Sequence, residues 1–272
     1  MEISFTKAHA AGNDFLVVEA AGVVSAGLAE EGLAEFSRQI CDRHLGVGAD
    51  GVEIVDAAGP DAKADAAIRL FNSDGSEAEI SGNGTRCVAA YLLDRGRQSP
   101  LRIATMAGVK ALRLIERRGT TFRIEMSMGR PAYRREEIGC RLETGLGRRE
   151  ITIVDAGNPQ CALLVDDFEF DWRALGREIE SHPRFPNRTN VSFTRVLDRH
   201  TVDVRFWERG AGETMSSGTG STGAVVAAIL AGLAESPVTV VTPAGEMKLR
   251  WEDEVLLEGP AQLVAVGRYL AA

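Results

Sequence analysis

The chain has 272 residues, of which 44% are hydrophobic and 26% charged, and its formal net charge is −8. This composition is typical of a globular protein, and the negative charge argues against nucleic acid as a partner. No run of about 18 apolar residues could span a bilayer, and the chain does not start with a secretory signal. The four cysteines are scattered and form no disulfide framework. We therefore expect a cytoplasmic protein with reduced thiols and no membrane role.

The first half of the chain alternates short β-branched and aliphatic runs with two helical stretches. Strands are expected at residues 3–7, 15–18, 52–55, 67–71, 101–105, 109–115 and 121–127, and helices at 29–43 and 84–94. A glycine-rich turn at 46–51 precedes the third strand. This order of elements predicts a mixed sheet with helices.

The second half repeats the plan in outline. Strands are expected at residues 150–154, 161–165, 202–207, 238–242, 246–251 and 254–258, and helices at 172–181 and 218–234. The segment 224–231 is apolar on every side, which is typical of a buried helix. We expect an α/β (α+β) fold of two similar halves, each a mixed β-sheet around a central helix. The predicted halves are residues 1–120, with 263–272 as a candidate addition, and residues 121–262.

A short passage occurs twice, once before each predicted central helix. The two copies are Ser81-Gly82-Asn83-Gly84-Thr85 and Ser217-Gly218-Thr219-Gly220-Ser221. A hydroxyl residue and two glycines at the start of a helix leave backbone N–H groups, and the positive end of the helix dipole, able to hold an anion. The pair predicts one ligand held from two sides.

Two other interpretations of these glycines are open. Residues 218–223 read G-x-G-x-x-G between a strand and a helix, as in dinucleotide-binding folds. The strand that follows lacks the acidic residue expected to bind a ribose, and Glu208 lies where a pyrophosphate would sit. The glycines could also be plain helix-start turns without a ligand. Four asparagines together with Glu208 and Arg209 favour a ligand, because amides, a carboxylate and a guanidinium bind the charged groups of an amino acid.

Several longer motifs then resemble one family, the cofactor-independent diaminopimelate epimerases. They are His9-x-x-Gly12-Asn13-Asp14-Phe15, Asp42-Arg43-x-x-Gly46-Val47-Gly48-Ala49-Asp50-Gly51, Asn72-Ser73-Asp74-Gly75-Ser76-Glu77, Gly157-Asn158-Pro159, Glu208-Arg209-Gly210-Ala211-Gly212-Glu213-Thr214 and Gly259-Pro260-Ala261. Their order and spacing cover nearly the whole chain.

The resemblance implies two similar halves facing a cleft and an isomerase of lysine and peptidoglycan biosynthesis that converts LL- to meso-diaminopimelate. It implies no cofactor and no metal, a small amino-acid substrate, and it leaves a homodimer open. One group removes the α-proton while a second delivers a proton to the opposite face. Carried over residue by residue, the catalytic positions are Ser81 and Ser217. The implied substrate-binding residues are Asn13, Asn72, Gly82, Asn83, Asn158, Asn190, Glu208, Arg209, Gly218 and Thr219.

The sequence departs from the family at these catalytic positions. The family has cysteine where this chain has Ser81 and Ser217, and histidine where it has Gln160. A cysteine, with a reference pKa of about 8.5, is tuned into a base far more easily than a serine hydroxyl. Two alternatives therefore stand beside the epimerase. One is a divergent member that catalyses another isomerisation or a dehydration. The other is an amino-acid-binding protein impaired in catalysis, through natural divergence or engineered Cys-to-Ser substitution.

Overall fold

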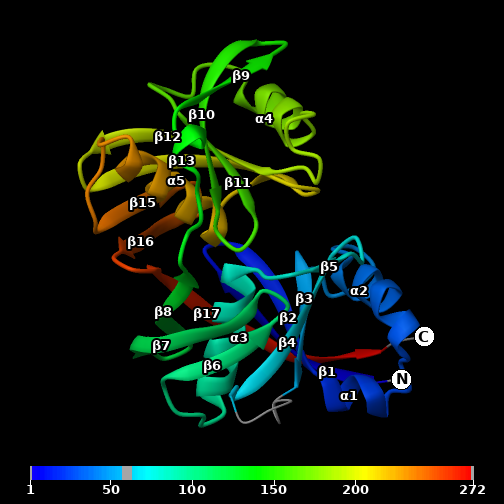
Figure 1. The fold of residues 1–272 in the computed structure, drawn as a ribbon. Helices are drawn as coiled ribbons and strands as arrows, with labels where there is room; N and C mark the ends of the chain where they lie inside the picture. Colours follow the sequence, from blue (N-terminus) through cyan, green and yellow to red (C-terminus); the bar gives the residue numbers. More distant parts are fainter. Residues whose placement is uncertain (1, 57–62, 271–272) are drawn as a thin grey trace. The chain divides into compact units, whose positions relative to one another are not determined.

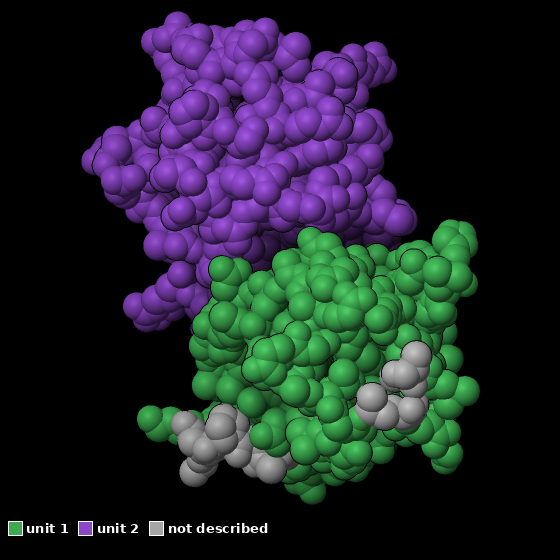
Figure 2. Space-filling model, turned by 90° about the vertical axis from the view of Figure 1, so that its right-hand side faces the viewer, with its two compact units in different colours: residues 1–126, 259–272 green, residues 127–258 purple. Residues whose placement is uncertain are grey.

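The computed structural model describes residues 2–56 and 63–270. The chain divides into two compact units (Figure 2). Unit 1 consists of residues 1–126 and 259–272, and unit 2 of residues 127–258. Each unit surrounds one long helix with strands (Figure 1).

Unit 1 is a sheet that closes on itself. Its elements are β1 (Glu2–Ala10), β2 (Asn13–Glu19), α1 (Ala20–Ser25), the 3-10 turn η1 (Glu30–Gly32), α2 (Leu33–Cys41), β3 (Gly51–Asp56), β4 (Ala66–Asn72), β5 (Glu77–Ala78), α3 (Gly82–Asp94), β6 (Leu101–Thr105), β7 (Gly108–Arg118), β8 (Thr121–Gly129) and the end of β17 (Val255–Leu270). The strands pair in the order β17-β1-β2-β3-β4-β6-β7-β8, and β8 pairs back with β17. The pairs β2–β3 and β4–β6 are parallel, and the other register-defined pairs are antiparallel.

Unit 2 repeats the same succession of pairings. Its elements are η2 (Arg135–Glu137), β9 (Cys140–Thr144), β10 (Gly147–Asp155), β11 (Pro159–Leu164), α4 (Trp172–Glu180), β12 (Asn190–Asp198), β13 (Thr201–Glu208), β14 (Gly212–Thr214), α5 (Gly218–Leu230), β15 (Val238–Thr242), β16 (Gly245–Trp251) and the start of β17. The order β10-β11-β12-β13-β15-β16-β17 has parallel pairs at β11–β12 and β13–β15. These positions match the parallel pairs of unit 1. The predicted fold class, two similar halves with mixed sheets, is confirmed.

The central helices α3 and α5 pack against strands of their own unit. Helix α3 contacts β1, β2, β3 and β6, and α5 contacts β10 to β13, β15 and β16. Small residues make this enclosure possible, since Ala224, Ala227 and Ala228 of α5 are all fully buried. Burial of each larger side chain, such as Val225, stabilises the unit by roughly 1.5–3 kcal/mol. The buried helix expected from residues 224–231 is confirmed as far as Ala228, and α5 itself ends at Leu230, which is only partly buried.

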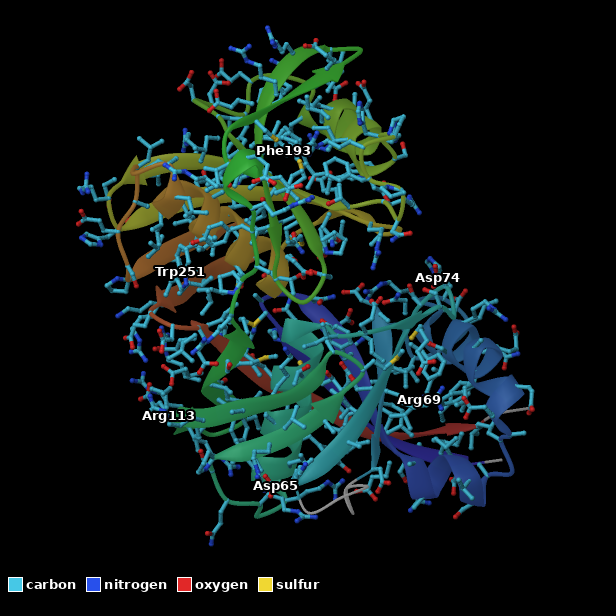
Figure 3. The ribbon with its side chains drawn as sticks, in the orientation of Figure 1. Asp65, Arg69, Asp74, Arg113, Phe193 and Trp251 are labelled. Carbon is cyan, nitrogen blue, oxygen red and sulfur yellow. The ribbon has the colours of Figure 1, made fainter. Side chains whose placement is uncertain are left out.

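Outer helices cover a second hydrophobic cluster in each unit. In unit 1, α2 places Phe36 and Ile40 over residues of β1 to β4. In unit 2, α4 places Trp172 next to Phe193 of β12, with ring centroids 5.7 Å apart, and Figure 3 labels Phe193 in this core. The sheets are therefore buried on both faces where the helices lie, which holds the strand ends near the central helices in fixed positions.

Both long predicted helices are shorter in the structure. The helix expected at 29–43 begins at Leu33, after the 3-10 turn, and ends at Cys41 because Asp42 has extended backbone. The helix expected to reach residue 234 ends at Leu230, because Gly232 has φ +73°, a left-handed conformation that stops a helix.

The strands differ from the prediction in the length of the last strand and in four strands that were not predicted, β5, β9, β12 and β14. The last strand was expected at 254–258, but β17 continues to Leu270 and contributes to both units. Strand β12 (Asn190–Asp198) forms a hairpin with β13 and pairs in parallel with β11. The extension of β17 arises from pairing with β1, a strand distant in the sequence that no local pattern reports.

Candidate active site

The first glycine passage forms the N-terminus of α3, which we call the unit 1 mouth (residues 81–84). Ser81 has extended backbone, and its Oγ accepts a hydrogen bond of 3.1 Å from the Gly84 N–H. Its carbonyl accepts the first helical hydrogen bond, from Thr85. The N–H groups of Gly82 and Asn83 precede that bond, so this end of the helix is suited to an anion.

A chain of side-chain hydrogen bonds fixes the unit 1 mouth to the sheet. Asn83 Nδ2 donates to Asn13 Oδ1 at 3.2 Å, and Asn13 Nδ2 donates to Asp50 Oδ2 at 2.7 Å. Below them the buried Arg86 donates to Asn83 Oδ1 at 2.5 Å and to the Gly82 carbonyl at 3.1 Å. The structure thus brings together Asn13, Gly82 and Asn83, three of the predicted binding residues.

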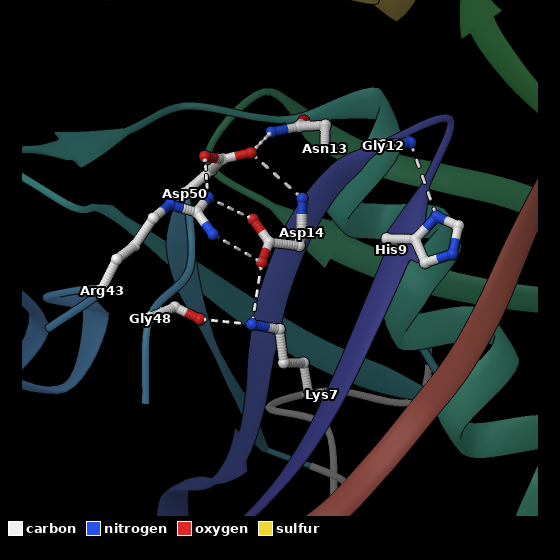
Figure 4. Close-up of polar contacts among 8 residues, drawn as sticks. All are labelled: Lys7, His9, Gly12, Asn13, Asp14, Arg43, Gly48 and Asp50. Carbon is white, nitrogen blue, oxygen red and sulfur yellow. Dashed lines mark hydrogen bonds and ion pairs between the residues drawn. The ribbon is translucent and has the colours of Figure 1, made fainter. Parts of the chain in front are cut away.

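An ion-pair cluster supports Asn13 from the other side (Figure 4). Arg43 donates to both Asp14 and Asp50 at 2.7 Å, and Lys7 Nζ lies 3.0 Å from Asp14. Burial raises the pKa of Asp14, but the hydrogen bonds from Arg43 and Lys7 outweigh it, and the pKa lies below its ordinary value. The motifs around these residues were recognised, but no role was predicted for Lys7, Arg43 or Asp50. They hold the strand end that carries Asn13.

Asn72 lies at the end of β4 and makes its hydrogen bonds within the turn that leads to the mouth. Its Nδ2 donates to Ser76 Oγ at 2.9 Å, and its backbone N–H donates to the Ser76 carbonyl. Ser76 in turn donates to Asp74, which Figure 3 labels at this turn. The structure therefore places Asn72 as a residue that holds the turn between β4 and the unit 1 mouth.

The second glycine passage forms the N-terminus of α5, the unit 2 mouth (residues 217–220). Ser217 Oγ accepts from the Gly220 N–H at 3.1 Å and donates to Glu208 Oε1 at 2.6 Å. Glu208 is the last residue of β13. Burial raises the pKa of the Glu208 carboxyl, and the hydrogen bond from Ser217 lowers it in part. The Ser217 hydroxyl therefore donates to a carboxyl group whose pKa is raised, next to Gly218 and Thr219.

The turn that follows Glu208 is held by Glu180, a residue that the sequence did not single out. Glu180 accepts from the Gly210 N–H at 2.7 Å and from Trp207 Nε1 at 2.8 Å, and it forms an ion pair with Arg188. Glu180 is buried at the end of α4, on the same face of the helix as its apolar residues. A carboxylate on an otherwise apolar helix face was the available signal.

The remaining predicted residues of unit 2 lie around the same turn. Asn190 Oδ1 accepts from the Arg209 N–H at 3.0 Å, and Asn190 Nδ2 donates to the Pro159 carbonyl at 3.0 Å. Gln160 is fully buried and donates to Asn158 Oδ1 at 2.6 Å. Its amide therefore orients Asn158.

The described residues, 2–56 and 63–270, contain neither a candidate metal site nor a candidate membrane-spanning helix. No group of three or more histidine, cysteine, aspartate or glutamate side chains there could hold a metal ion. Within the same ranges, no helix has the length and apolar character needed to cross a membrane. All four cysteines are free thiols: Cys41, Cys87 and Cys161 are buried, and Cys140 is half-buried.

Comparisons with known proteins identify relatives over nearly the whole chain. The family model described as diaminopimelate epimerase matches residues 5–133 and 152–264. A diaminopimelate epimerase of Pelotomaculum thermopropionicum is 41% identical over 97% of this chain and 98% of its own length, and one of Desulfitobacterium hafniense is 39% identical over 98% and 97%.

A solved structure shares the fold at much lower identity. The hydroxyproline epimerase of Agrobacterium vitis superposes with a TM-score of 0.72 over 98% of this chain and 90% of that protein, at 16% identity. The structural likeness concerns the fold, whereas the family-model match and the two relatives at 41% and 39% identity over nearly the full length show that the chain belongs to the diaminopimelate epimerase family.

Proposed function

We propose that this chain is a cofactor-independent amino-acid isomerase that converts LL- to meso-diaminopimelate, with Ser81 and Ser217 at the proton-transfer positions. The observation that carries the proposal is the hydrogen bond of 2.6 Å between Ser217 Oγ and the Glu208 carboxyl at the unit 2 mouth. It supplies an acid/base pair beside a helix N-terminus suited to a carboxylate. The names and identities of the relatives support the substrate.

In this mechanism the Ser217 oxygen takes the α-proton while its own proton passes to Glu208 Oε1. The electron pair left on the α-carbon spreads into the substrate carboxylate, whose growing charge is stabilised by N–H groups at a helix N-terminus. The Ser81 hydroxyl delivers a proton to the opposite face and takes one back from water, and Glu208 returns its proton to solvent. One proton leaves and one arrives, so the substrate and product differ only in configuration.

The other polar residues of the two units fit the rest of the substrate. Arg209, whose Nη1 donates to the Asn187 carbonyl at 3.2 Å, is suited to the distal carboxylate. Asn158 and Asn190 present amides next to that turn. A homodimer and a cytoplasmic location stay predictions.

A second candidate is an amino-acid-binding protein without turnover. Among the described residues, the Ser81 hydroxyl accepts from the Gly84 N–H and meets no carboxylate, unlike Ser217. A hydroxyl with no base beside it is a poor proton carrier. This candidate predicts binding of diaminopimelate without exchange of its α-proton.

The test is proton exchange at the α-carbon in heavy water, followed by NMR. The wild-type chain should incorporate deuterium into LL- and meso-diaminopimelate, and the rate should rise with pH through the raised pKa of Glu208, because the ionised carboxyl is the base. Glu208→Gln should slow the exchange by about 10²-fold or more and flatten the pH profile.

The exposed Glu116→Gln, on β7 of unit 1, serves as a control that removes a carboxyl elsewhere and should leave the rate unchanged. Tight binding with no exchange in the wild type would exclude the isomerase and favour the binding protein. No binding at all would contradict both candidates.

A further inference from the structure

One buried acid in unit 1 has no part in the mechanism above. Glu53 lies on β3, is fully buried, and neither of its carboxyl oxygens makes a hydrogen bond within the described part of the chain. Its side chain points at the first turn of α3, since a Cβ added to Gly84 would lie 2.0 Å from Glu53 Oε1. The carboxyl group therefore lies directly against the unit 1 mouth.

An unpaired carboxylate is very unfavourable in such a place. Burial raises the pKa of Glu53 well above its ordinary value, because the charged form loses its hydration and gains no hydrogen bond. The positive end of α3 favours the charged form, but a helix-terminus effect is smaller than the desolvation of an ion. The neutral acid is the form that fits the observed surroundings.

The charged and titratable groups near Glu53 come from α3 and β2. Arg86 of α3 is committed to Asn83 Oδ1 and the Gly82 carbonyl, and Asp14 of β2 is paired with Arg43 and Lys7. The third group is the buried thiol of Cys87. Burial raises the pKa of this thiol, and an ionised Glu53 raises it further. On β4, the residue paired with Glu53 is the apolar Leu70.

The fold itself does not require an acid at this position. Glu53 pairs with Leu70 across β3 and β4, and Ser192 pairs with Phe206 across the equivalent strands β12 and β13. The unit 2 mouth thus has the Phe206 ring close to Gly220, where unit 1 has a carboxyl close to Gly84.

We propose that Glu53 is a proton-linked positioning residue of the unit 1 mouth: it holds its proton while Gly82 and Asn83 bind a substrate carboxylate, and its ionisation weakens that binding. The proposal rests on the proposed function, which gives the ligand a carboxylate, and it adds that this carboxylate binds at the N-terminus of α3, whose first N–H groups are suited to an anion. Two negative charges at one helix end, with little water between them, repel each other strongly. Binding of the anion and ionisation of Glu53 therefore oppose each other.

This opposition has a measurable consequence by linkage. Above the pKa of Glu53 in the free protein, binding of the anion must be accompanied by uptake of up to one proton. The affinity should then fall by up to tenfold for each unit of pH, because one proton is linked to one ligand.

The first experiment is calorimetric titration with meso-diaminopimelate, across a range of pH and in buffers of different ionisation enthalpy. The wild type should take up a proton on binding, whereas Glu53→Gln, which cannot ionise, should lack that uptake and keep its affinity at high pH. Glu116→Gln, which removes an exposed carboxyl from β7 of the same unit, should behave as the wild type. Equal proton uptake by the wild type and Glu53→Gln would overturn the proposal.

The second experiment needs no ligand and measures the free energy of unfolding by urea as a function of pH. Because the folded pKa of Glu53 is raised, its contribution to stability is fully present below the unfolded pKa and is lost as pH rises through the folded pKa. The wild type should therefore lose stability relative to Glu53→Gln as pH rises. Glu53→Leu replaces Glu53→Gln if the amide variant does not fold. Parallel curves for the wild type and the variant would overturn the proposal.

The two hypotheses fail in different ways. If the wild type binds no diaminopimelate in any buffer, the proposed function is wrong and the linkage falls with it. If it binds and exchanges the α-proton, but the proton uptake is the same in Glu53→Gln, only the role of Glu53 is wrong.

Discussion

The two mouths use one backbone device and differ in where a carboxyl group lies. Ser81 and Ser217 both cap their helices, and each serine Oγ accepts from an N–H three residues later at 3.1 Å. In unit 2, Glu208 at the end of a strand accepts from the serine hydroxyl, and in unit 1 the buried Glu53 lies beneath the first turn. The two helix ends thus share one backbone geometry, and the neighbouring strands determine where a carboxyl group lies beside each.

The difference follows from which residue each strand offers. Asn72 ends β4, whereas Glu208 ends the equivalent strand β13. Two strand positions deeper, β4 has Leu70 and β13 has the larger Phe206, which lies against Gly220. In unit 1, Leu70 is the smaller of these two residues, and it pairs with Glu53 on the adjacent strand β3.

The largest expected effect is that of restoring thiols at the two mouths. The double variant S81C/S217C should exchange the α-proton of diaminopimelate about 10²–10⁴ times faster than the wild type, as positioned acid/base groups do. S81C alone should gain more than S217C alone, because Ser217 already has Glu208 as a base. The measurement is deuterium incorporation by NMR.

Ser221→Cys is the matched control for the thiols, since Ser221 is a fully buried hydroxyl residue in the first turn of α5. It should leave the rate near that of the wild type. An equal gain from S81C and S217C would contradict the difference drawn between the two mouths.

A smaller effect is expected from adding a methyl group beneath each mouth. Gly84→Ala would place Cβ 2.0 Å from Glu53 Oε1, and Gly220→Ala would place it 2.7 Å from Phe206 Cδ1. Each should lower the free energy of unfolding by about 1–3 kcal/mol, because the side chains of a packed interior can move only slightly to make room for the methyl group. The measurement is urea denaturation.

The partner of each glycine can be identified by a double-mutant cycle. Glu53→Ala should couple to Gly84→Ala by roughly 0.5–3 kcal/mol, and not to Gly220→Ala, because only Gly84 contacts the carboxyl. Additive behaviour of Glu53→Ala with Gly84→Ala would show that the carboxyl moves aside freely.

The smallest expected effect is the loss of stability on removing each serine hydroxyl. It distinguishes helix capping from the hydrogen bond to the Glu208 carboxyl. Ser81→Ala should cost about 1 kcal/mol of stability, as expected for loss of an N-cap. Ser217→Ala should cost at least about 1 kcal/mol more, because it also leaves the Glu208 carboxyl without its donor. Thermal or urea unfolding of both variants at neutral pH makes the comparison. Equal losses would mean that Glu208 finds another donor.

Local sequence patterns were sufficient to predict the mouths and the central helices. Ser-Gly-x-Gly before an alanine-rich run predicts a capped, buried helix, because the serine Oγ accepts from a backbone N–H three residues on and small residues allow strands to surround the helix. The start of both helices was therefore predictable to within two residues. The end of α5 was not, because a glycine in a left-handed conformation stopped it earlier than the apolar pattern suggested.

Other features depended on contacts between distant parts of the chain. Glu180 lies about thirty residues before the turn that it holds, and Gly210 N–H reaches it across strands of unit 2. Glu53 lies between apolar residues of β3, and only the packing of β3 against α3 shows that its carboxyl faces Gly84. A carboxylate among apolar neighbours is the local signal that such residues carry, but it does not identify their partners, which are distant in the sequence.

The sequence by itself determined the family and the two helices capped by Ser81 and Ser217, since each follows from residue identity and short-range hydrogen bonding. Only the tertiary structure decided which acid serves which mouth. The reason is physical: the proton affinity of a carboxyl depends on its hydration and its partners, and packing sets both. Glu208 has the Ser217 hydroxyl, and Glu53 has neither water-facing surface nor a hydrogen-bond partner among the described residues.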